Sequence, residues 1–292
     1  TGKGIISGAG GYLRFRTNAG DIWDDEDHPD VPFPTASPYR LRGVHFLDSD
    51  LGFVVGQWYR IAKTTNGGYT WNHVNPAPQL QGQNLLAITF NTNGSHGVAV
   101  GEAPNSSGPK ILRTTVTAPV GSAWGVPSQI TEYPGTISTD KELRAVAWAG
   151  NETFWTAGAT GLIYQSSDGG DQWQQFLPPG VPWSTFNSFE IEGVAFRDLN
   201  TGLFVGSTVG STNGLGLAFR YLDNSGTISW DDVGPTLPLS LNFWRIHGVA
   251  LNVPGDKAYA VATAFDASTG EELGILLEKN GIAGASRFSV VG

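Results

Sequence analysis

The sequence contains no cysteine and no methionine among its 292 residues. The absence of cysteine excludes disulfides and thiolate metal sites, and it leaves the compartment open. Basic residues are scarce as well, because 17 Lys and Arg stand against 26 Asp and Glu, which gives a net charge of −9. Phosphate binding needs a basic face, so we do not expect nucleic acid as a partner.

Long apolar runs and helical periodicity are also missing. No run of 18 apolar residues occurs, so we expect no membrane-spanning segment, and no segment keeps a helical period. The first residue is Thr1 rather than Met, from which we expect a processed, exported protein in a periplasm, in a lumen or outside the cell. The length suits one large domain, residues 1–292.

Glycine is abundant instead, with 40 residues, as many tight turns require. The stretch Arg42–Val74 contains four short runs rich in β-branched and aromatic residues, bounded by Gly, Asn or Asp. These runs predict four strands in a row, at 42–46, 52–56, 60–65 and 70–74. One such sheet cannot bury both of its faces alone, so the pattern should recur along the chain.

The pattern of the first strand does recur, as a small residue, Val or Ile, any residue and then a large apolar residue. It is found at Gly43–Phe46, Ala87–Phe90, Ala145–Trp148, Gly193–Phe196 and Gly248–Leu251. Because the second-strand and third-strand patterns follow in the same order, we predict an all-β fold, a single β-propeller of four-stranded antiparallel blades. The expected blades are about 1–28 (partial), 41–74, 85–124, 143–176, 192–233 and 247–292.

The count of these repeats predicts six blades. The first repeat lacks its first strand, because Gly4–Gly8, Tyr12–Thr17 and Ile22–Asp25 match the later three strands. The final strand, Arg287–Val291, either forms the outer strand of the last blade or supplies the missing inner strand of the first. If neither holds, a segment upstream of Thr1 is missing and the ring has seven blades.

Two turns between third and fourth strands carry a shared motif, and we call them the box turns. Ser166–Trp173 fits the Asp-box pattern S/T-x-D-x-G-x-x-W, and Thr64–Trp71 fits it with Asn in place of Asp. The Asn or Asp side chain accepts hydrogen bonds from its own turn, the glycine takes a positive φ, and the Trp covers the sheet. The residues with this structural role are Asn66, Gly68, Trp71, Asp168, Gly170 and Trp173.

Taken as a whole, the repeats resemble those of the photosystem II assembly-factor-like propeller family, a relative of the Asp-box propellers of sialidases, sortilins and xyloglucanases. The resemblance covers nearly the whole chain. It implies a propeller that docks onto a membrane protein complex.

Catalytic and metal-binding patterns are absent from the sequence. The Arg-Ile-Pro opening of a sialidase is missing, no pair of opposed carboxylates suggests a glycosidase, and no G-x-S-x-G elbow occurs. The five His are scattered, and the acids within Trp23–Asp30 lack the spacing of a Ca²⁺ loop. We therefore expect no catalytic residue, no metal site and no cofactor.

The long loops predict where partners bind. In a propeller, the crossovers between blades share one face with the loops between second and third strands, and the box turns lie on the other. Long loops on a rigid scaffold often carry binding residues. On this crossover face we expect the long segments Asp24–Tyr39, Asn75–Asn84, Glu102–Pro109, Gly125–Glu142, Leu177–Glu190, Ser207–Gly216 and Val233–Trp244.

Two groups of side chains on this face are candidates for binding. The aromatic residues either contact protein or sugar partners or fold back over the channel: Trp58, Tyr59, Trp183, Phe186, Phe189, Phe243 and Trp244. The arginines Arg42, Arg144 and Arg245 begin inner strands at the channel mouth, and Glu192 has the same place in another repeat. These charged residues either bind a partner or form a ring of salt bridges.

The sequence thus favours a non-catalytic propeller, an interaction, assembly or accessory subunit of a larger complex that is membrane-bound or photosynthetic. The alternative is a carbohydrate-binding propeller or a degenerate glycosidase of the Asp-box type, with a glycan as partner. A third interpretation, a structural domain of a longer chain, follows from the incomplete first repeat.

Overall fold

The computed structural model describes residues 4–8, 13–16, 40–74, 84–102, 110–114, 124–132, 142–180, 187–208, 216–235, 241–252, 255–266, 268–284 and 286–291. The named elements in these ranges are strands and two 3₁₀ turns, η2 (Gln57–Tyr59) and η5 (Ala159–Gly161). Within the same ranges, no helix has the length and apolar character needed to cross a bilayer.

The strands form antiparallel sheets that follow one another along the chain. The first sheet is a pair, β1 (Gly4–Ser7) and β2 (Leu13–Arg16). The second contains β3 (Leu41–Phe46), β4 (Gly52–Gly56), β5 (Arg60–Thr64) and β6 (Asn72–Val74). The third contains β7 (Leu85–Phe90), β8 (Gly97–Gly101) and β9 (Lys110–Thr114).

The last three sheets each have four consecutive antiparallel strands. The fourth contains β11 (Leu143–Gly150), β12 (Thr153–Gly158), β13 (Ile163–Ser166) and β14 (Gln172–Gln175). The fifth contains β15 (Phe189–Asp198), β16 (Thr201–Thr208), β17 (Gly216–Asn224) and β18 (Thr227–Asp232). The sixth contains β19 (Leu241–Leu251), β20 (Lys257–Asp266), β21 (Glu271–Asn280) and β22 (Ser289–Val290).

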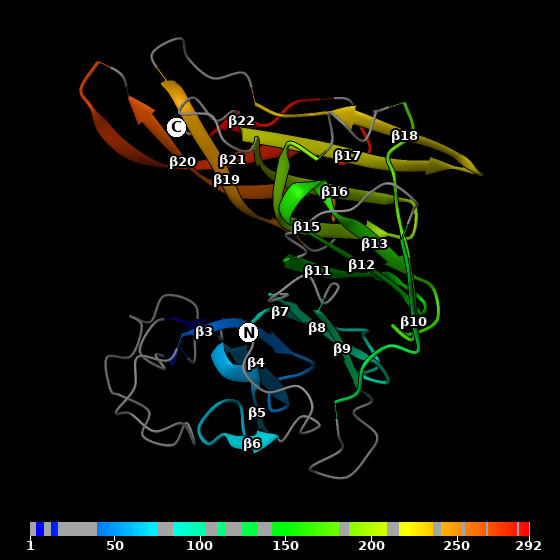
Figure 1. Cartoon of the computed structure of the whole chain (residues 1–292). Coiled ribbons are helices and arrows are strands. Elements are labelled where there is room, and N and C mark those ends of the chain that lie inside the picture. The colour runs from blue at the N-terminus through cyan, green and yellow to red at the C-terminus, as the bar shows by residue number, and fades with distance from the viewer. Residues whose placement is uncertain are drawn as a thin grey trace.

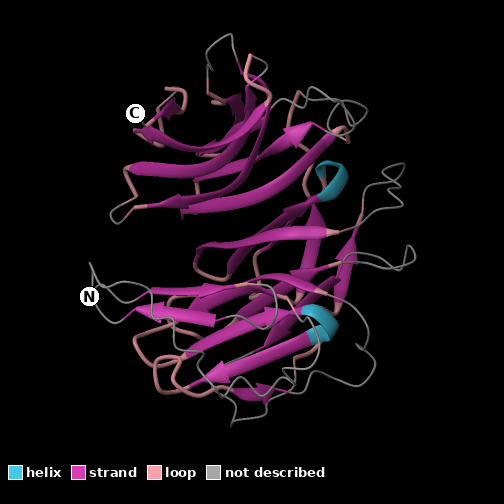
Figure 2. Cartoon of the chain, turned by 90° about the vertical axis from the view of Figure 1, so that its left-hand side faces the viewer, coloured by secondary structure: helices cyan, strands magenta, loops and turns pink. Residues whose placement is uncertain are grey.

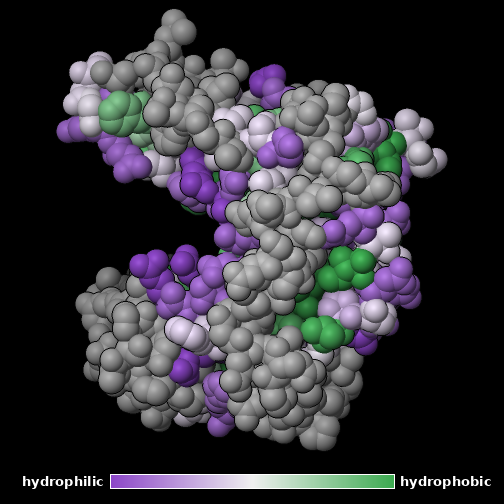
Figure 3. Space-filling view, in the orientation of Figure 1, coloured by the Kyte–Doolittle hydropathy of each residue, from purple (hydrophilic) through white to green (hydrophobic). Residues whose placement is uncertain are grey.

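The sheets are arranged as the blades of a propeller. The first strands of the second to sixth sheets, β3, β7, β11, β15 and β19, contact one another in chain order and line the centre, and β1 contacts β3 (Figure 1). The described sheets form an arc with the second sheet near one end and the sixth at the other. The space-filling view shows a deep recess between the two arms of this arc (Figure 3).

Each blade is held to the next by an apolar core of its own. Along β4, Val54 packs toward the first sheet, whereas Phe53 and Val55 pack toward the third, because successive strand residues point to opposite faces. We call the face toward the next sheet in the chain the forward face, and the other the rear face. An aromatic residue from the outer part of each blade fills the core behind it: Trp71, Trp124, Trp173, Trp230 and Phe288.

A β-bulge occurs near the start of every inner strand. At this shared bulge one residue has no partner in the register, because the pairing shifts around it; β11, β15 and β19 each have a second shift elsewhere. These bulged residues are Arg42, Leu86, Arg144, Glu192 and His247. In four sheets the second strand has a glycine opposite the bulge, and a Cβ there would overlap a carbonyl oxygen at or just before the start of the inner strand: Gly56, Gly101, Gly158 and Gly206. The sixth sheet has Ala262 at this place.

The structure corrects three expectations about segments. Ser289–Val290 pairs with β21, so the final strand belongs to the last sheet and the alternative pairing with the first is wrong. Part of the expected loop Gly125–Glu142 is a strand, β10 (Gln129–Thr131), which pairs in parallel with β14. Val233–Trp244 overlaps β19, and its Phe243 and Trp244 lie in that strand. The expected strand Ile22–Asp25 and the acidic segment Trp23–Asp30 lie outside the described residues.

Candidate functional site

The crossover rim is the surface where inner strands begin. The η2 turn reaches it directly, since the Gln57 N–H donates to the Arg40 carbonyl at 3.0 Å, just before β3. The Ala159 N–H of η5 likewise donates to the Glu142 carbonyl at 2.8 Å, just before β11. Figure 2 shows the two turns on the same side of the molecule. We use the name crossover rim for these turns and the adjoining starts of inner strands.

Trp58 is the most exposed large apolar side chain in the described part of the chain, at 62%. Its φ is 60°, in the left-handed region, which costs a bulky residue about 1–2 kcal/mol. The Trp58 N–H donates to Asn84 Oδ1 at 3.3 Å, which ties the turn to the start of the next inner strand. The fold thus exposes an indole ring to solvent at the rim.

Charged side chains at the rim join three blades. The Arg144 guanidinium donates from Nε to Glu142 at 2.9 Å and from Nη1 to Glu192 at 2.6 Å, and it also contacts Glu190. Arg245 of the sixth sheet pairs with the same Glu192. The cluster is mostly buried, and the surrounding carboxylates raise the pKa of Arg144 despite the opposing effect of burial. Arg144 and Arg245 therefore act first as ties between blades.

The sequence analysis placed the rim charges at one equivalent position in each repeat, and the structure corrects this for Arg245. Arg42, Arg144 and Glu192 do share the bulged position, but in the sixth sheet that position is His247. Arg245 lies two residues earlier, in the place that Glu190 has in the fifth sheet. Arg42 is exposed at the rim.

The other aromatic candidates have different places. Phe189 was expected in a loop, but it lies in β15, half-buried, with its ring 5.5 Å from that of Phe219. Phe243 and Trp244 lie in β19, and Tyr59 lies in η2. The side chains of these last three, and the whole of Trp183 and Phe186, lie outside the described residues.

The box turns have closely matching hydrogen bonds. In the first, Asn66 Oδ1 accepts from the Thr64 hydroxyl at 2.9 Å and from the Thr70 N–H at 3.0 Å. The Trp71 indole N–H donates to the Gly68 carbonyl at 2.9 Å. In the second turn Asp168, Ser166, Gly170 and Trp173 repeat these contacts. The residues of each box bond within their own turn and bury a Trp between blades.

Asp168 is ionised more easily than an ordinary carboxyl. Burial raises its pKa, but hydrogen bonds from the Gln172 N–H, the Ser166 hydroxyl and the Asp171 N–H, together with the charge of Arg113, outweigh burial and lower it. A low pKa suits a permanent hydrogen-bond acceptor and does not suit a general acid.

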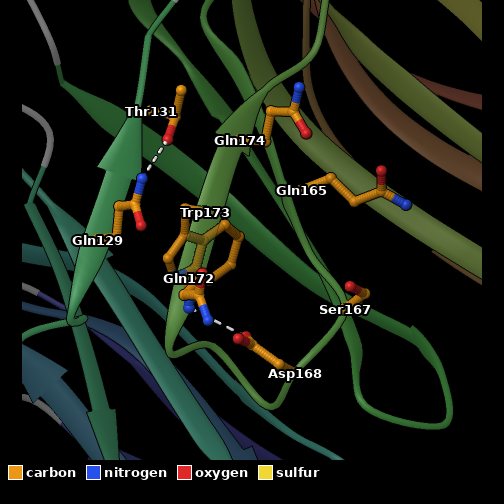
Figure 4. A pocket seen from close by; sticks show the side chains of 8 residues that line it. All are labelled: Gln129, Thr131, Gln165, Ser167, Asp168, Gln172, Trp173 and Gln174. Atoms are coloured by element: carbon orange, nitrogen blue, oxygen red, sulfur yellow. Dashed lines mark hydrogen bonds between the residues drawn. The ribbon is translucent and has the colours of Figure 1, made fainter.

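A polar groove beside this box turn was not predicted. It has a volume of about 310 Å³ and lies over one face of β10, β14 and the end of β13 with its box turn (Figure 4). Its lining is rich in amides: Gln129, Thr131, Gln165, Ser167, Asp168, Gln172, Trp173 and Gln174. The groove exists because β10 adds a fifth strand, and nothing local in Gln129–Thr131 indicates that pairing. Among the described residues, no group of three His, Asp or Glu could bind a metal ion.

Comparisons with known proteins show similarity at the level of the fold. No protein family and no curated protein matches the sequence. YCF48 from Cyanidioschyzon merolae is 16% identical, with 89% of this chain and 87% of that chain covered and a TM-score of 0.53. The WD40 repeats of RRP9 are 10% identical, with 88% and 68% covered and a TM-score of 0.54.

A GH74 enzyme from Niastella koreensis is also similar, at 16% identity, with 86% of this chain and 38% of that chain covered and a TM-score of 0.55. The similar structures thus include an enzyme beside YCF48 and a WD40 protein. Since every identity is below 25%, these likenesses establish the fold alone: the chain is a β-propeller, and its function has to be argued from its own residues.

Proposed function

We propose that this chain is a non-catalytic propeller that binds a protein partner at the crossover rim, as an assembly or accessory subunit of a larger complex. The observation that carries the proposal is Trp58, an indole exposed in solvent on a left-handed turn. Strained backbone that presents a large apolar side chain to water is unfavourable for folding alone. Such geometry is typical of an interaction anchor, and Trp is the residue type most enriched among binding hot spots.

The surroundings of Trp58 fit this role. Its turn is anchored through Asn84, whose side chain in turn donates to Glu102 at 2.5 Å. An anchor on a rigid support loses little conformational entropy on binding. Arg42 is exposed on the neighbouring inner strand and offers a cation to an acidic or polar partner surface.

The described residues favour binding over catalysis. Glycoside hydrolysis requires two carboxyl groups on opposite sides of a bond, and the groove in Figure 4 contains only Asp168. At the rim, the carboxylates of Glu142, Glu190 and Glu192 are paired with arginines, which removes them from acid–base roles. The similarity to YCF48, a photosystem II assembly factor, agrees with an assembly role. A membrane-bound or photosynthetic complex is the finer form of this proposal.

The test is capture of partners by the tagged chain under gentle conditions, followed by mass spectrometry. We expect stoichiometric subunits of one complex with the native chain and their loss with Trp58→Ala. Tyr69→Ala is the matched control, since Tyr69 is an exposed aromatic residue in a box turn on the other face. Equal capture by both variants, or a chain that purifies alone, would refute the proposal.

Glycan binding is the second candidate, and the amide-lined groove favours it, because amides and a carboxylate suit sugar hydroxyls. Trp173 is fully buried there, so no aromatic face is free for stacking on a sugar ring. A glycan array with the native chain and with Gln172→Ala tests it. Binding that the substitution weakens would favour this second function.

A further inference from the structure

The two box turns differ at the residue whose side chain holds the turn together. The first turn has Asn66 and the second has Asp168. In both turns the hydrogen bonds that this side chain accepts go to a single oxygen, Oδ1. An amide oxygen is thus sufficient to hold the turn, and the negative charge of Asp168 is not required for it.

The second polar atom of this side chain is used inside the turn in only one of the two boxes. Asn66 Nδ2 donates to the Thr70 hydroxyl at 2.9 Å. Gln172 has the place of Thr70 in the second turn, and its backbone N–H donates to Asp168 Oδ1 at 2.9 Å. No donor among the described residues bonds to Asp168 Oδ2. That oxygen can therefore accept a hydrogen bond from a ligand.

Asp168 lines the polar groove of the fourth blade (Figure 4). The groove lies on the forward face, since Gln165 pairs with Trp155, which packs toward the fifth sheet. Gln129 of β10 pairs with Gln172 of β14, so both strands contribute amides to it. The sheet of the first box turn ends at β6 and has no fifth strand in the part of the chain that is described. The carboxylate is thus found in the box turn that adjoins a groove.

The charge of the groove is negative. Among the described residues that line it, Asp168 has the only charged side chain. Arg113 is near enough for its charge to lower the pKa of Asp168, but its guanidinium forms an ion pair with Asp171. Glu132 lies on the rear side, where it accepts a hydrogen bond from the buried Tyr164 hydroxyl at 3.0 Å. A cationic ligand is therefore favoured here over a neutral one, and an anionic ligand is disfavoured.

The remaining lining distinguishes an amino sugar from a simple alkyl amine. The methylene stem of an alkyl amine is stabilised by apolar surface, and the one aromatic residue of the lining, Trp173, is only 1% exposed. The amides of Gln165 and Gln174 and the hydroxyl of Ser167 instead offer donors and acceptors to sugar hydroxyls. The volume of about 310 Å³ lies at the lower end of the range for ligand sites, roughly 300–1,000 Å³, which suits a small sugar.

We propose that this groove binds an amino sugar, with the protonated amine at Asp168 Oδ2 and the sugar hydroxyls at the glutamine amides. The proposal rests on the second candidate function, glycan binding, and specifies its ligand class. It is independent of the protein partner at the crossover rim. Sialic and uronic acids should bind more weakly, because their carboxylates would face that of Asp168.

Isothermal titration calorimetry tests the proposal at roughly pH 6, where an amine is protonated and an aspartate is ionised. Glucosamine should bind more tightly than glucose, N-acetylglucosamine, glucuronic acid and n-butylamine. Asp168→Asn should weaken glucosamine binding about tenfold, the difference between a charged and a neutral hydrogen bond. It should keep the fold, since Asn66 holds the equivalent turn. Asp48→Asn is the control, because it removes an exposed carboxylate of the second sheet, and it should bind as the native chain does.

The outcomes separate the ligand class from glycan binding itself. If the sugars bind equally well to the native chain, the amino-sugar inference is wrong and glycan binding stands. Binding of n-butylamine as tight as that of glucosamine would also overturn it, because the hydroxyls would then contribute nothing. If no sugar binds, both the inference and the second candidate function are refuted. The order of affinities for the native chain decides the matter even if Asp168→Asn fails to fold.

Discussion

Arg144 of β11 and Glu192 of β15 occupy the same bulged position on neighbouring inner strands, and Arg144 Nη1 donates to Glu192 Oε1 at 2.6 Å. Glu192 also pairs with Arg245 on the next strand. One carboxylate therefore connects the fourth, fifth and sixth blades at the rim.

Replacing Glu192 by Gln should lower the free energy of unfolding by about 1–3 kcal/mol, because it removes the carboxylate that Arg245 pairs with and one of the three that surround Arg144. Urea denaturation measures the change. The matched substitution Arg197→Gln, in the more exposed pair Arg197–Asp198, should cost less than about 0.5 kcal/mol. Equal losses for the two variants would show that the cluster does not tie the blades together.

Replacing Trp58 by Gly should leave the free energy of unfolding within about 1 kcal/mol of the native value. The glycine relieves the left-handed backbone, and this gain opposes the greater entropy of the unfolded chain. Trp155→Ala, at a fully buried indole, should cost about 3–5 kcal/mol. Thermal denaturation compares the two variants, and a large loss for Trp58→Gly would assign that side chain to packing.

Replacing Gly158 by Ala should destabilise the fold by about 1–3 kcal/mol, since the new Cβ would overlap the carbonyl oxygen of Glu142. Gly248→Ala is the control, because the nearest atom, Val261 Cγ2, would be 4.0 Å away, and it should be nearly neutral. Chemical denaturation of both variants is the measurement. A neutral Gly158→Ala would mean that the bulge can relax around the added methyl group.

His45 should make the protein sensitive to acid. Burial on β3 beside Phe90 lowers its pKa from 6.5 to about 4. Between these two values the unfolded chain binds a proton that the folded chain does not, so stability falls as the pH drops from 6.5 toward 4. The loss over this window is roughly 2–3 kcal/mol.

The check is the free energy of unfolding against pH for the native chain and for His45→Gln. The His45 variant should show a flatter profile across pH 4–6.5 than the native chain. Parallel profiles for the two proteins would contradict the assignment to His45.

The fold class was predictable from the sequence, and the structure confirms it. A continuous apolar run such as Phe53, Val54 and Val55 indicates a strand buried on both faces, and the glycines on either side of the run mark its ends. The same pattern repeated in order predicts blades. This repeated strand pattern does not depend on contacts between residues that are distant in the sequence. It could therefore be recognised from each short segment alone.

Other features could not be predicted from the sequence, because they depend on which strand or blade packs against a residue in the folded protein. Gln129–Thr131 has no strand signature, and only its parallel partner β14 makes it a strand and creates the groove. Val261 lies in an apolar run between alanines, just as a residue covered by another blade would. The sequence pattern therefore does not show whether another blade covers it. The exposure of Trp58 similarly depends on the geometry of a three-residue turn.

The bulge at the start of each inner strand assigns core packing and presentation of a side chain at the rim to different residues of the same strand. Residues after the bulge keep the alternation that the cores require, whereas the bulged residue has no partner in the ladder. That position has accepted Arg, Leu, Arg, Glu and His in five successive blades. Three of these five positions, Arg42, Leu86 and His247, lie outside the Arg144–Glu192 ion pair, so a library randomised at those three would vary the rim chemistry and leave that tie between blades in place.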